Sequence, residues 1–237
     1  MEIGRSLSFP FREPSWLRRT AVGALLELFP LLVVLPALLG TLRHSVRHGF
    51  PVTTVILAAV AGLGTRWLTL GYFRRVALGV FRGDVAGLPA WDRLDEDLVE
   101  GIKLWLVGLG LFLPAAGLTA AMAFLFVVAG APWAAWLPVL LVLPLAALAT
   151  LFFLPAALLA FVAEGELGAA FAVSRLSRRI GAAAGAYLLA FLLAVGAEIV
   201  AQAGLLVACV GIFATRFLAH SMAVHAFASA YRRWLRT

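Results

Sequence analysis

The longest apolar tract of the chain, Ile180 to Phe227, is too long to be one membrane-crossing helix. Its forty-eight residues would form a helix of roughly 72 Å, whereas the hydrocarbon core of a bilayer is about 30 Å thick. The tract must therefore fold back on itself. The polar residues Glu198 and Gln202, followed by Gly204, mark the expected turn. A short turn there makes the two resulting helices antiparallel neighbours.

Similar apolar tracts fill most of the sequence. Apolar residues make up 63% of the chain and charged residues 13%, against about 45–50% and ~25% in soluble domains. Uniform tracts rich in Leu and Ala lack the alternation of membrane β-barrel strands. We therefore predict an all-α fold: a polytopic transmembrane helical bundle with a cytoplasmic segment at 1–20, a single transmembrane domain at 21–231 and a basic cytoplasmic tail at 232–237. Its six predicted spans are residues 21–40, 51–72, 102–128, 133–155, 180–199 and 204–227.

The basic residues predict which side of the membrane each loop occupies. With a cytoplasmic N-terminus, fifteen Lys and Arg side chains fall inside the cell and only Arg43 and Arg47 fall outside. Because cytoplasmic loops carry an excess of Lys and Arg, we expect both termini in the cytoplasm. Pro30 and Pro36 leave open whether the segment 21–50 crosses the bilayer fully or is partly re-entrant.

The formal net charge of +7 does not by itself indicate nucleic-acid binding. The basic residues lie at the ends of apolar tracts, where they meet anionic lipid, and no arginine-rich tract with interleaved aromatic residues is present. We expect the lipid bilayer as a partner and no nucleic acid. The single cysteine, Cys209, can form neither a disulfide framework nor a thiolate metal cluster.

Five of the twelve carboxylates lie within nine residues, at Asp92, Asp95, Glu96, Asp97 and Glu100. Acidic residues favour the positive end of a helix dipole, so the stretch predicts a solvated helix start that also neutralises nearby arginines. A divalent-cation site at Asp92, Asp95 and Asp97 is the alternative, but the glycine and final glutamate of a calcium loop are missing. We predict no metal and no cofactor.

The segment Glu164 to Arg179 repeats this charge pattern. Its glutamates come early and its arginines come late, which suits the helix dipole. Leu167 and Phe171 recur at helical spacing. Together with the acidic stretch, the segment predicts two interfacial helical segments on the cytoplasmic side.

Charged residues inside a membrane are costly and usually mark a functional site or a structural network. Four such candidates fall within the predicted spans: Glu27, Arg66, Arg216 and Glu198. Glu27 and Arg66 each lie six residues from the cytoplasmic end of adjacent antiparallel spans, roughly 9 Å deep, which predicts an ion pair between them.

Arg216 lies twelve residues beyond Gly204, roughly 18 Å into the sixth predicted span and close to the midplane. We expect Glu27 to be nearest to it in depth and Glu198 to lie near the outer surface. An arginine at this depth suits an anionic-substrate site and a structural network equally. His220 and His225 follow on the same helix, but a spacing of five is poor for shared metal ligation.

Several stretches carry a resemblance to a known family. They are FPFREPSWLRR, GYFRRVALGVFRG with the following LPAWD and EGIKLW, LPAALLAFVAEGELGAAF, and the basic tail AYRRW. Together these resemble the membrane-protein family called domain of unknown function 4013, over nearly the whole chain. The matching motif residues are Phe9, Pro10, Trp16, Gly71, Tyr72, Leu88, Pro89, Gly101 and Pro155. The resemblance implies a bacterial or archaeal multi-span protein of the inner membrane. It implies no catalytic residues, since the family has no assigned activity.

No arrangement of a nucleophile with a base is evident in the sequence. Ser174, Ser177 and Ser221 lack a convincing acid–base partner, and no phosphate loop or zinc-helix signature occurs. We therefore expect a non-enzymatic membrane protein that handles or transports an amphiphilic or anionic small molecule. An accessory or scaffolding subunit, presenting its cytoplasmic segments to a membrane or cytoplasmic protein partner, is one alternative. An intramembrane enzyme is another and requires polar groups that converge on a cavity.

Overall fold

A computed structural model describes residues 3–43, 52–84, 87–206 and 210–234, and the side chains within these ranges other than those of 36–43, 52 and 54. The described residues form helices and contain no strand, which confirms the predicted all-α fold. The α-helices are α1 Ile3–Ser8, α2 Trp16–Arg43, α3 Val52–Arg82, α4 Leu94–Val128, α5 Trp136–Glu164, α6 Leu167–Phe171, α7 Val173–Ala182, α8 Ala184–Ala201 and α9 Gly211–Trp234. Three 3-10 helices accompany them: η1 Phe9–Arg12, η2 Pro132–Ala135 and η3 Gln202–Leu206.

Four of the described helical segments are long and apolar enough to cross a membrane, as expected of a polytopic membrane protein. They are Val55–Arg82, Leu94–Val128, Pro132–Glu164 and Ala184–Leu206, and they overlap the second to fifth predicted spans. The predicted spans 21–40 and 204–227 correspond to α2 and α9, which are not among the four. The side chains of residues 36–43 lie outside the described part of α2. The count of six spans therefore remains a prediction.

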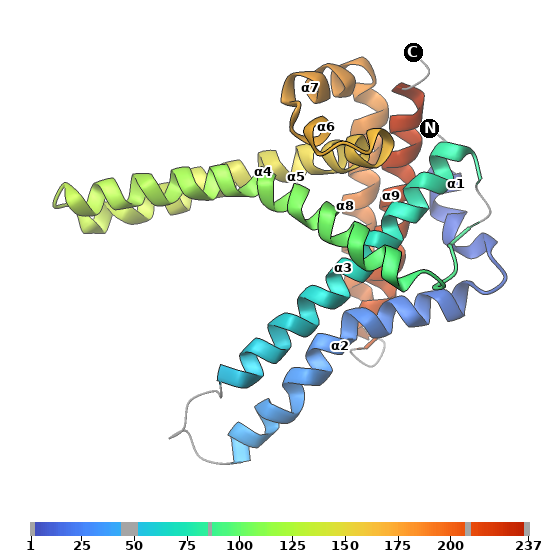
Figure 1. Cartoon of the computed structure of the whole chain (residues 1–237), viewed down its shortest axis with the longest axis horizontal. Coiled ribbons are helices and arrows are strands. Elements are labelled where there is room, and N and C mark those ends of the chain that lie inside the picture. The colour runs from blue at the N-terminus through green and yellow to red at the C-terminus, as the bar shows by residue number, and fades with distance from the viewer. Residues whose placement is uncertain (1–2, 44–51, 85–86, 207–209, 235–237) are drawn as a thin grey trace. The chain divides into compact units, whose positions relative to one another are not determined.

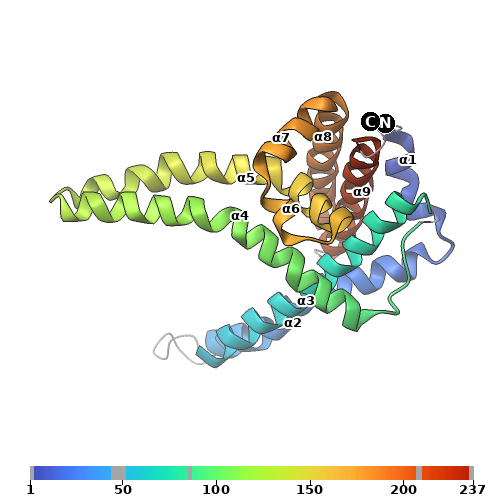
Figure 2. The same ribbon diagram turned by 45° about the horizontal axis from the view of Figure 1, so that its top comes forward.

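The chain divides into two compact units, which we describe separately. Unit 1 comprises Met1–Ile102 with Gly185–Thr237, and unit 2 comprises Lys103–Ala184. In unit 1, α2 packs along α3, and α9 packs against both of them. Helices α8 and α9 lie side by side in both views (Figure 1, Figure 2). Helix α2 is continuous through Pro30, so its described part shows no re-entrant break.

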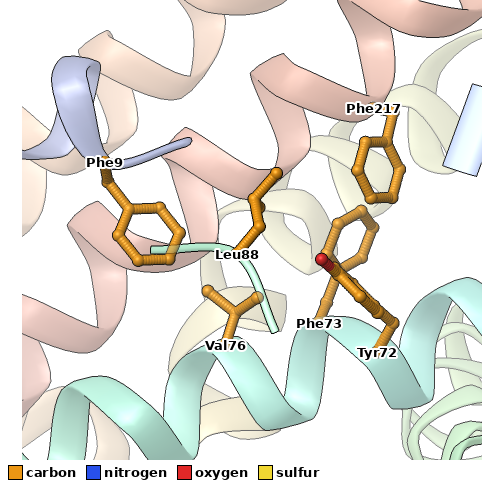
Figure 3. Packing of buried hydrophobic residues seen from close by; sticks show 6 residues of the cluster. All are labelled: Phe9, Tyr72, Phe73, Val76, Leu88 and Phe217. Atoms are coloured by element: carbon orange, nitrogen blue, oxygen red, sulfur yellow. The ribbon is translucent and has the colours of Figure 1, made fainter. Parts of the chain in front are cut away.

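The core of unit 1 joins segments that are far apart in the sequence (Figure 3). Its buried members are Phe9 from η1, Tyr72, Phe73 and Val76 from α3, Leu88 from the following loop, and Phe217 from α9. Three of them, Phe9, Tyr72 and Leu88, belong to the family-like motifs. Pro10 is buried beside Phe9, and Trp16 begins α2 with its ring edge-on to Phe11 at 4.9 Å. The motifs therefore build a shared core.

Tyr72 connects this core to the loop before α4. Its ring stacks on Trp91 with centroids 4.0 Å apart, and its hydroxyl donates to the backbone oxygen of Pro89 at 2.9 Å. The Trp91 ring N–H donates to the backbone oxygen of Arg19 at 2.9 Å. The Arg19 guanidinium in turn donates to the backbone oxygen of Leu88. The buried Tyr72 hydroxyl and the partly buried Trp91 indole thus both have hydrogen-bond partners, as buried polar groups require.

Two glycines allow α3 and the start of α4 to cross with their backbones in contact. A Cβ atom placed on Gly71 would overlap the backbone of Asp97, and one placed on Gly101 would overlap the backbone oxygen of Trp67. Both positions therefore require a residue without a side chain. The two glycines of the family-like motifs thus lie where the two backbones meet.

The acidic stretch forms the start of α4, with Asp95, Glu96 and Asp97 in its first turn, as predicted. Its carboxylates pair with arginines: Arg74 with Glu100 at 3.2 Å, Arg93 with Glu96 at 3.4 Å, and Arg75 with both Asp92 and Asp97 at 2.8 and 2.6 Å. The expectation of a fully solvated cap is wrong for Asp97, which is only 1% exposed. It is buried because the close crossing of α3 and α4 brings it against Arg75. The stretch is also not a separate interfacial helix, since α4 continues unbroken to Val128.

In unit 2, α6 and α7 pack on α5. The part of α4 that belongs to this unit lies beside α5 in both views (Figure 1, Figure 2). Pro155 lies inside α5. Helix α5 ends at Glu164 and is capped by Gly165, whose φ of 75° is the left-handed conformation common after helix ends. Glu164 pairs with Arg175 at 2.9 Å and with Arg179 at 2.6 Å. The predicted segment Glu164 to Arg179 is thus helical, but it consists of two short helices.

Candidate functional site

The charged residues predicted inside the membrane come together in unit 1. A cavity of about 200 Å³ lies between α2, α3 and α9. It is lined by Glu27 and Pro30 of α2, by Gly62, Thr65, Arg66 and Thr69 of α3, and by Phe213, Arg216 and His220 of α9. Glu198 of α8 reaches the same group of residues by pairing with Arg216. All four predicted residues therefore belong to one polar site, which we call the charged cavity.

The local structure of α3 determines which groups can donate hydrogen bonds into the charged cavity. Thr65 donates its hydroxyl to the backbone oxygen of Ala61 at 3.0 Å, with Gly62 as a second acceptor at 3.2 Å. Thr69 donates to the backbone oxygen of Arg66 at 2.9 Å. Such bonds to the preceding turn are usual for threonine in an apolar helix. Because the threonine protons are used within α3, the guanidinium groups are the principal donors.

Arg216 pairs with Glu198, not with Glu27 as its predicted depth suggested. Its Nε lies 3.0 Å from Glu198 Oε1, and the two side chains are 44% and 38% exposed. The depth estimate assumed that the sixth span begins at Gly204. Residues 202–206 instead form η3, and α9 begins at Gly211. Arg216 is therefore only five residues, roughly 7.5 Å, from the start of its helix and close to the end of α8.

Glu27 and Arg66 line the same cavity, but no ion pair joins them. Glu27 instead lies within ion-pair distance of His220, with 3.8 Å between Glu27 Oε1 and His220 Nδ1. Among the described residues, no carboxylate lies within 4.0 Å of the Arg66 guanidinium. The Arg66 side chain is exposed. The charged cavity thus contains a guanidinium that is accessible to a ligand.

His220 occupies the centre of the charged groups, and the sequence reasoning missed this role. Its Nδ1 faces Glu27 and its Nε2 faces Glu198 Oε2, both at 3.8 Å. These distances exceed that of a hydrogen bond, and both His220 Nδ1 and Glu27 Oε1 are buried without a hydrogen-bond partner in the described structure. In the sequence, the spacing of four residues between Arg216 and His220 indicates that both lie on one helix face.

The described residues also limit what chemistry this part of the chain offers. Within them, no group of three or more His, Cys, Asp or Glu side chains is placed to hold a metal ion. Ser221 is buried and donates to the backbone oxygen of Phe217 at 2.8 Å, and Ser177 donates to that of Val173 at 2.8 Å. Cys209, Arg47, His44 and His48 lie outside the described residues.

Residues of the unit 1 core lie next to the charged cavity on the same helices. Tyr72 and Phe73 follow Thr69 on α3, and Phe217 follows Arg216 on α9. The Phe73 ring contacts the His220 ring edge-on at 5.8 Å between centroids. Helices α3 and α9 therefore contribute to both the core and the charged cavity. Packing in the core fixes the positions of these two helices and of the charged residues they carry.

The comparison with known families agrees with the resemblance seen in the sequence. The family described as "Protein of unknown function (DUF4013)" matches residues 54–212 of the 237-residue chain. The match is narrower than the resemblance, since Phe9, Pro10, Trp16 and the basic tail lie outside it. No curated protein and no solved structure shows significant similarity to the chain. Because the match covers more than half of its residues, the chain belongs to the DUF4013 family.

Proposed function

We propose that this protein is a non-enzymatic inner-membrane protein that binds an anionic or amphiphilic small molecule in the charged cavity. Both termini lie in the cytoplasm in this proposal, as the excess of Lys and Arg on one side suggests. The observation that carries it is Arg66, an exposed residue that lines the cavity with no described carboxylate within 4.0 Å of its guanidinium. Such a cation within a span is expensive unless a counterion accompanies it.

The position of Arg66 along α3 supports this view. Val55–Arg82 is the candidate span, and Arg66 lies near its middle. Arg75, which pairs with the acids at the start of α4, is nine residues further along, about 13 Å away. Arg66 is therefore too deep to share those carboxylates. A bound anion would supply the direct contact that Arg66 lacks, and Arg216 on α9 would be the second contact.

Phosphodiester monoanions are the chemical class that fits this pair best. A guanidinium recognises phosphate oxygens through two parallel hydrogen bonds, and two arginines facing one cavity offer this geometry twice. The same group occurs in a lipid headgroup and in a small soluble molecule. The cavity volume of about 200 Å³ accommodates the headgroup but not the acyl chains of a lipid, so an amphiphile would leave its chains in the bilayer.

The test is equilibrium binding to purified protein in nanodiscs of zwitterionic lipid. Dimethyl phosphate probes a free solute and dioctanoyl phosphatidylglycerol probes a headgroup. We expect one of the two probes to bind the wild type and to bind Arg66→Gln at least tenfold more weakly. Arg178→Gln, an exposed arginine of α7 outside the cavity, is the control and should bind as the wild type does. Equal binding by Arg66→Gln and wild type, or no binding of either probe, would overturn the proposal.

Transport is a separate step that reconstitution measures. If the protein moves its ligand across the bilayer, proteoliposomes should show a flux of the bound probe that is lost in Arg216→Ala. Equal flux in wild type and Arg216→Ala removes the basis for transport.

A further inference from the structure

We infer that the charged cavity takes up a proton together with its anion, and that His220 is the residue that binds this proton. The inference rests on the proposed function and specifies it, because it makes binding of an anion depend on proton uptake at a named group. It follows from the placement of His220 and from the charge balance of the cavity.

Charged residues from four helices lie around His220. Glu27 approaches from α2, Arg66 from α3, Glu198 from α8, and Arg216 lies one helical turn away on α9. With His220 neutral, two carboxylates balance two guanidinium groups. An anion that enters this neutral set would leave one negative charge uncompensated. Protonated His220 adds the single positive charge that a monoanion requires.

The imidazole ring of His220 lies between two carboxylates. Each ring nitrogen faces a carboxylate oxygen at 3.8 Å, Nδ1 toward Glu27 and Nε2 toward Glu198. A neutral imidazole carries one N–H, so one nitrogen then points its lone pair at a carboxylate. A protonated ring carries an N–H on both nitrogens and can donate to both carboxylates. The buried His220 Nδ1 and Glu27 Oε1, which lack hydrogen-bond partners in the described structure, would then satisfy each other.

The carboxylates of the cavity and the bound anion compete for the arginines. Glu198 is paired with Arg216 at 3.0 Å. When His220 is protonated, its two N–H groups can donate to Glu27 and Glu198. These carboxylates then attract the guanidinium groups less strongly. Arg216 is then available to the anion together with Arg66, which has no described carboxylate within 4.0 Å.

Thermodynamic linkage gives the expected result. If one proton accompanies each anion, the apparent Kd of the bound probe should tighten by up to about tenfold for each unit by which the pH falls across the measured range, and anion binding should strengthen proton binding reciprocally. Dimethyl phosphate and phosphatidylglycerol carry phosphodiesters that keep their charge across this range. The pH dependence therefore belongs to the protein.

The experiment is calorimetric titration of wild-type protein in buffers of different ionisation enthalpy, which counts the protons taken up with the probe. We expect close to one proton per anion. His220→Gln should bind the probe weakly at all pH values without proton uptake, and His220→Lys should bind it tightly without proton uptake. His225→Gln is the matched control on the same helix, since His225 contacts Ser6 and Phe9 outside the cavity, and it should behave as the wild type does.

The outcomes separate the two proposals. Anion binding without proton uptake in the wild type would overturn the coupling and leave the proposed function intact. Proton uptake that persists in His220→Gln would overturn the assignment to His220. Absence of anion binding at every pH would overturn the proposed function itself. If His220→Gln does not fold, the proton count on the wild type still tests the coupling, and proton uptake that persists in His220→Lys would overturn the assignment to His220.

Discussion

The guanidinium of Arg75 donates two hydrogen bonds to the buried carboxylate of Asp97, from Nε to Oδ1 at 2.8 Å and from Nη2 to Oδ2 at 2.6 Å. This pair joins α3 to the first turn of α4. Removing one partner of a buried pair leaves an uncompensated charge, which costs about 3–5 kcal/mol. We therefore expect Asp97→Asn to lower the free energy of unfolding by about 3 kcal/mol. Thermal unfolding in detergent measures this, with the exposed Asp95→Asn as the control.

The crossing of α3 and α4 gives a second prediction. Gly71→Ala and Gly101→Ala each place a methyl group against a neighbouring backbone, so both should prevent native packing or lower the unfolding temperature by many degrees. Gly64, also on α3, has nothing within 4 Å of its Cβ position. Gly64→Ala should therefore be neutral or stabilising by up to about 1 kcal/mol. Equal tolerance of alanine at all three positions would contradict the close crossing.

Tyr72 provides a graded test of the motif core. Tyr72→Phe removes the hydroxyl that donates to Pro89 and should cost about 1 kcal/mol, because only one hydrogen bond is lost. Tyr72→Ala also removes the ring that stacks on Trp91 and should cost about 3–5 kcal/mol. Chemical denaturation of the two variants should show this order. An equal loss in both would mean that the hydroxyl alone accounts for the role of Tyr72.

The pair of Arg75 with Asp92 predicts a small acid sensitivity. Because Arg75 donates a hydrogen bond to its carboxylate, the pKa of Asp92 lies below the ordinary value of 3.8. Its contribution to stability is therefore present above pH 4 and is lost as the pH falls through the lowered pKa. The contribution is small because Asp92 is 62% exposed. Asp92→Asn should flatten the stability curve below pH 4, and an unchanged slope would show that the contact is not formed.

Variants of Arg216 test whether its partner is Glu198, as in the structure, or Glu27, as its predicted depth suggested. If Glu198 is its partner, Arg216→Glu should be destabilising, and the double variant Glu198→Arg with Arg216→Glu should recover part of the loss. The double-mutant cycle should give a coupling energy of about 0.5–1 kcal/mol for this half-exposed pair. Coupling of Arg216 to Glu27, with none to Glu198, would restore the depth-based expectation.

Local patterns in the sequence predicted much of this fold. The acidic stretch marked the start of α4 because helix dipoles and nearby arginines both favour acids there. Glu198 and Gln202 marked the end of α8, since a helix of the whole tract would exceed the bilayer thickness. Such features depend on neighbours in the sequence, and they were confirmed.

Features that depend on distant contacts could not be predicted in this way. Nothing near Gly71 in the sequence shows that Asp97 will lie against it. The partner of Arg216 depended on where α9 begins, and the 3-10 helix at residues 202–206 moved that point by seven residues. His220 was considered for metal binding with His225, whereas its position between Glu27 and Glu198 requires three helices to meet.

The most direct test is an experimental structure of the protein with dimethyl phosphate, in a bilayer that contains phosphatidylglycerol. We expect density for an anionic group in the charged cavity, within hydrogen-bond distance of both Arg66 and Arg216. A structure in which Arg66 is bound to Glu27 and the space between Arg66 and Arg216 holds no anion would contradict this expectation.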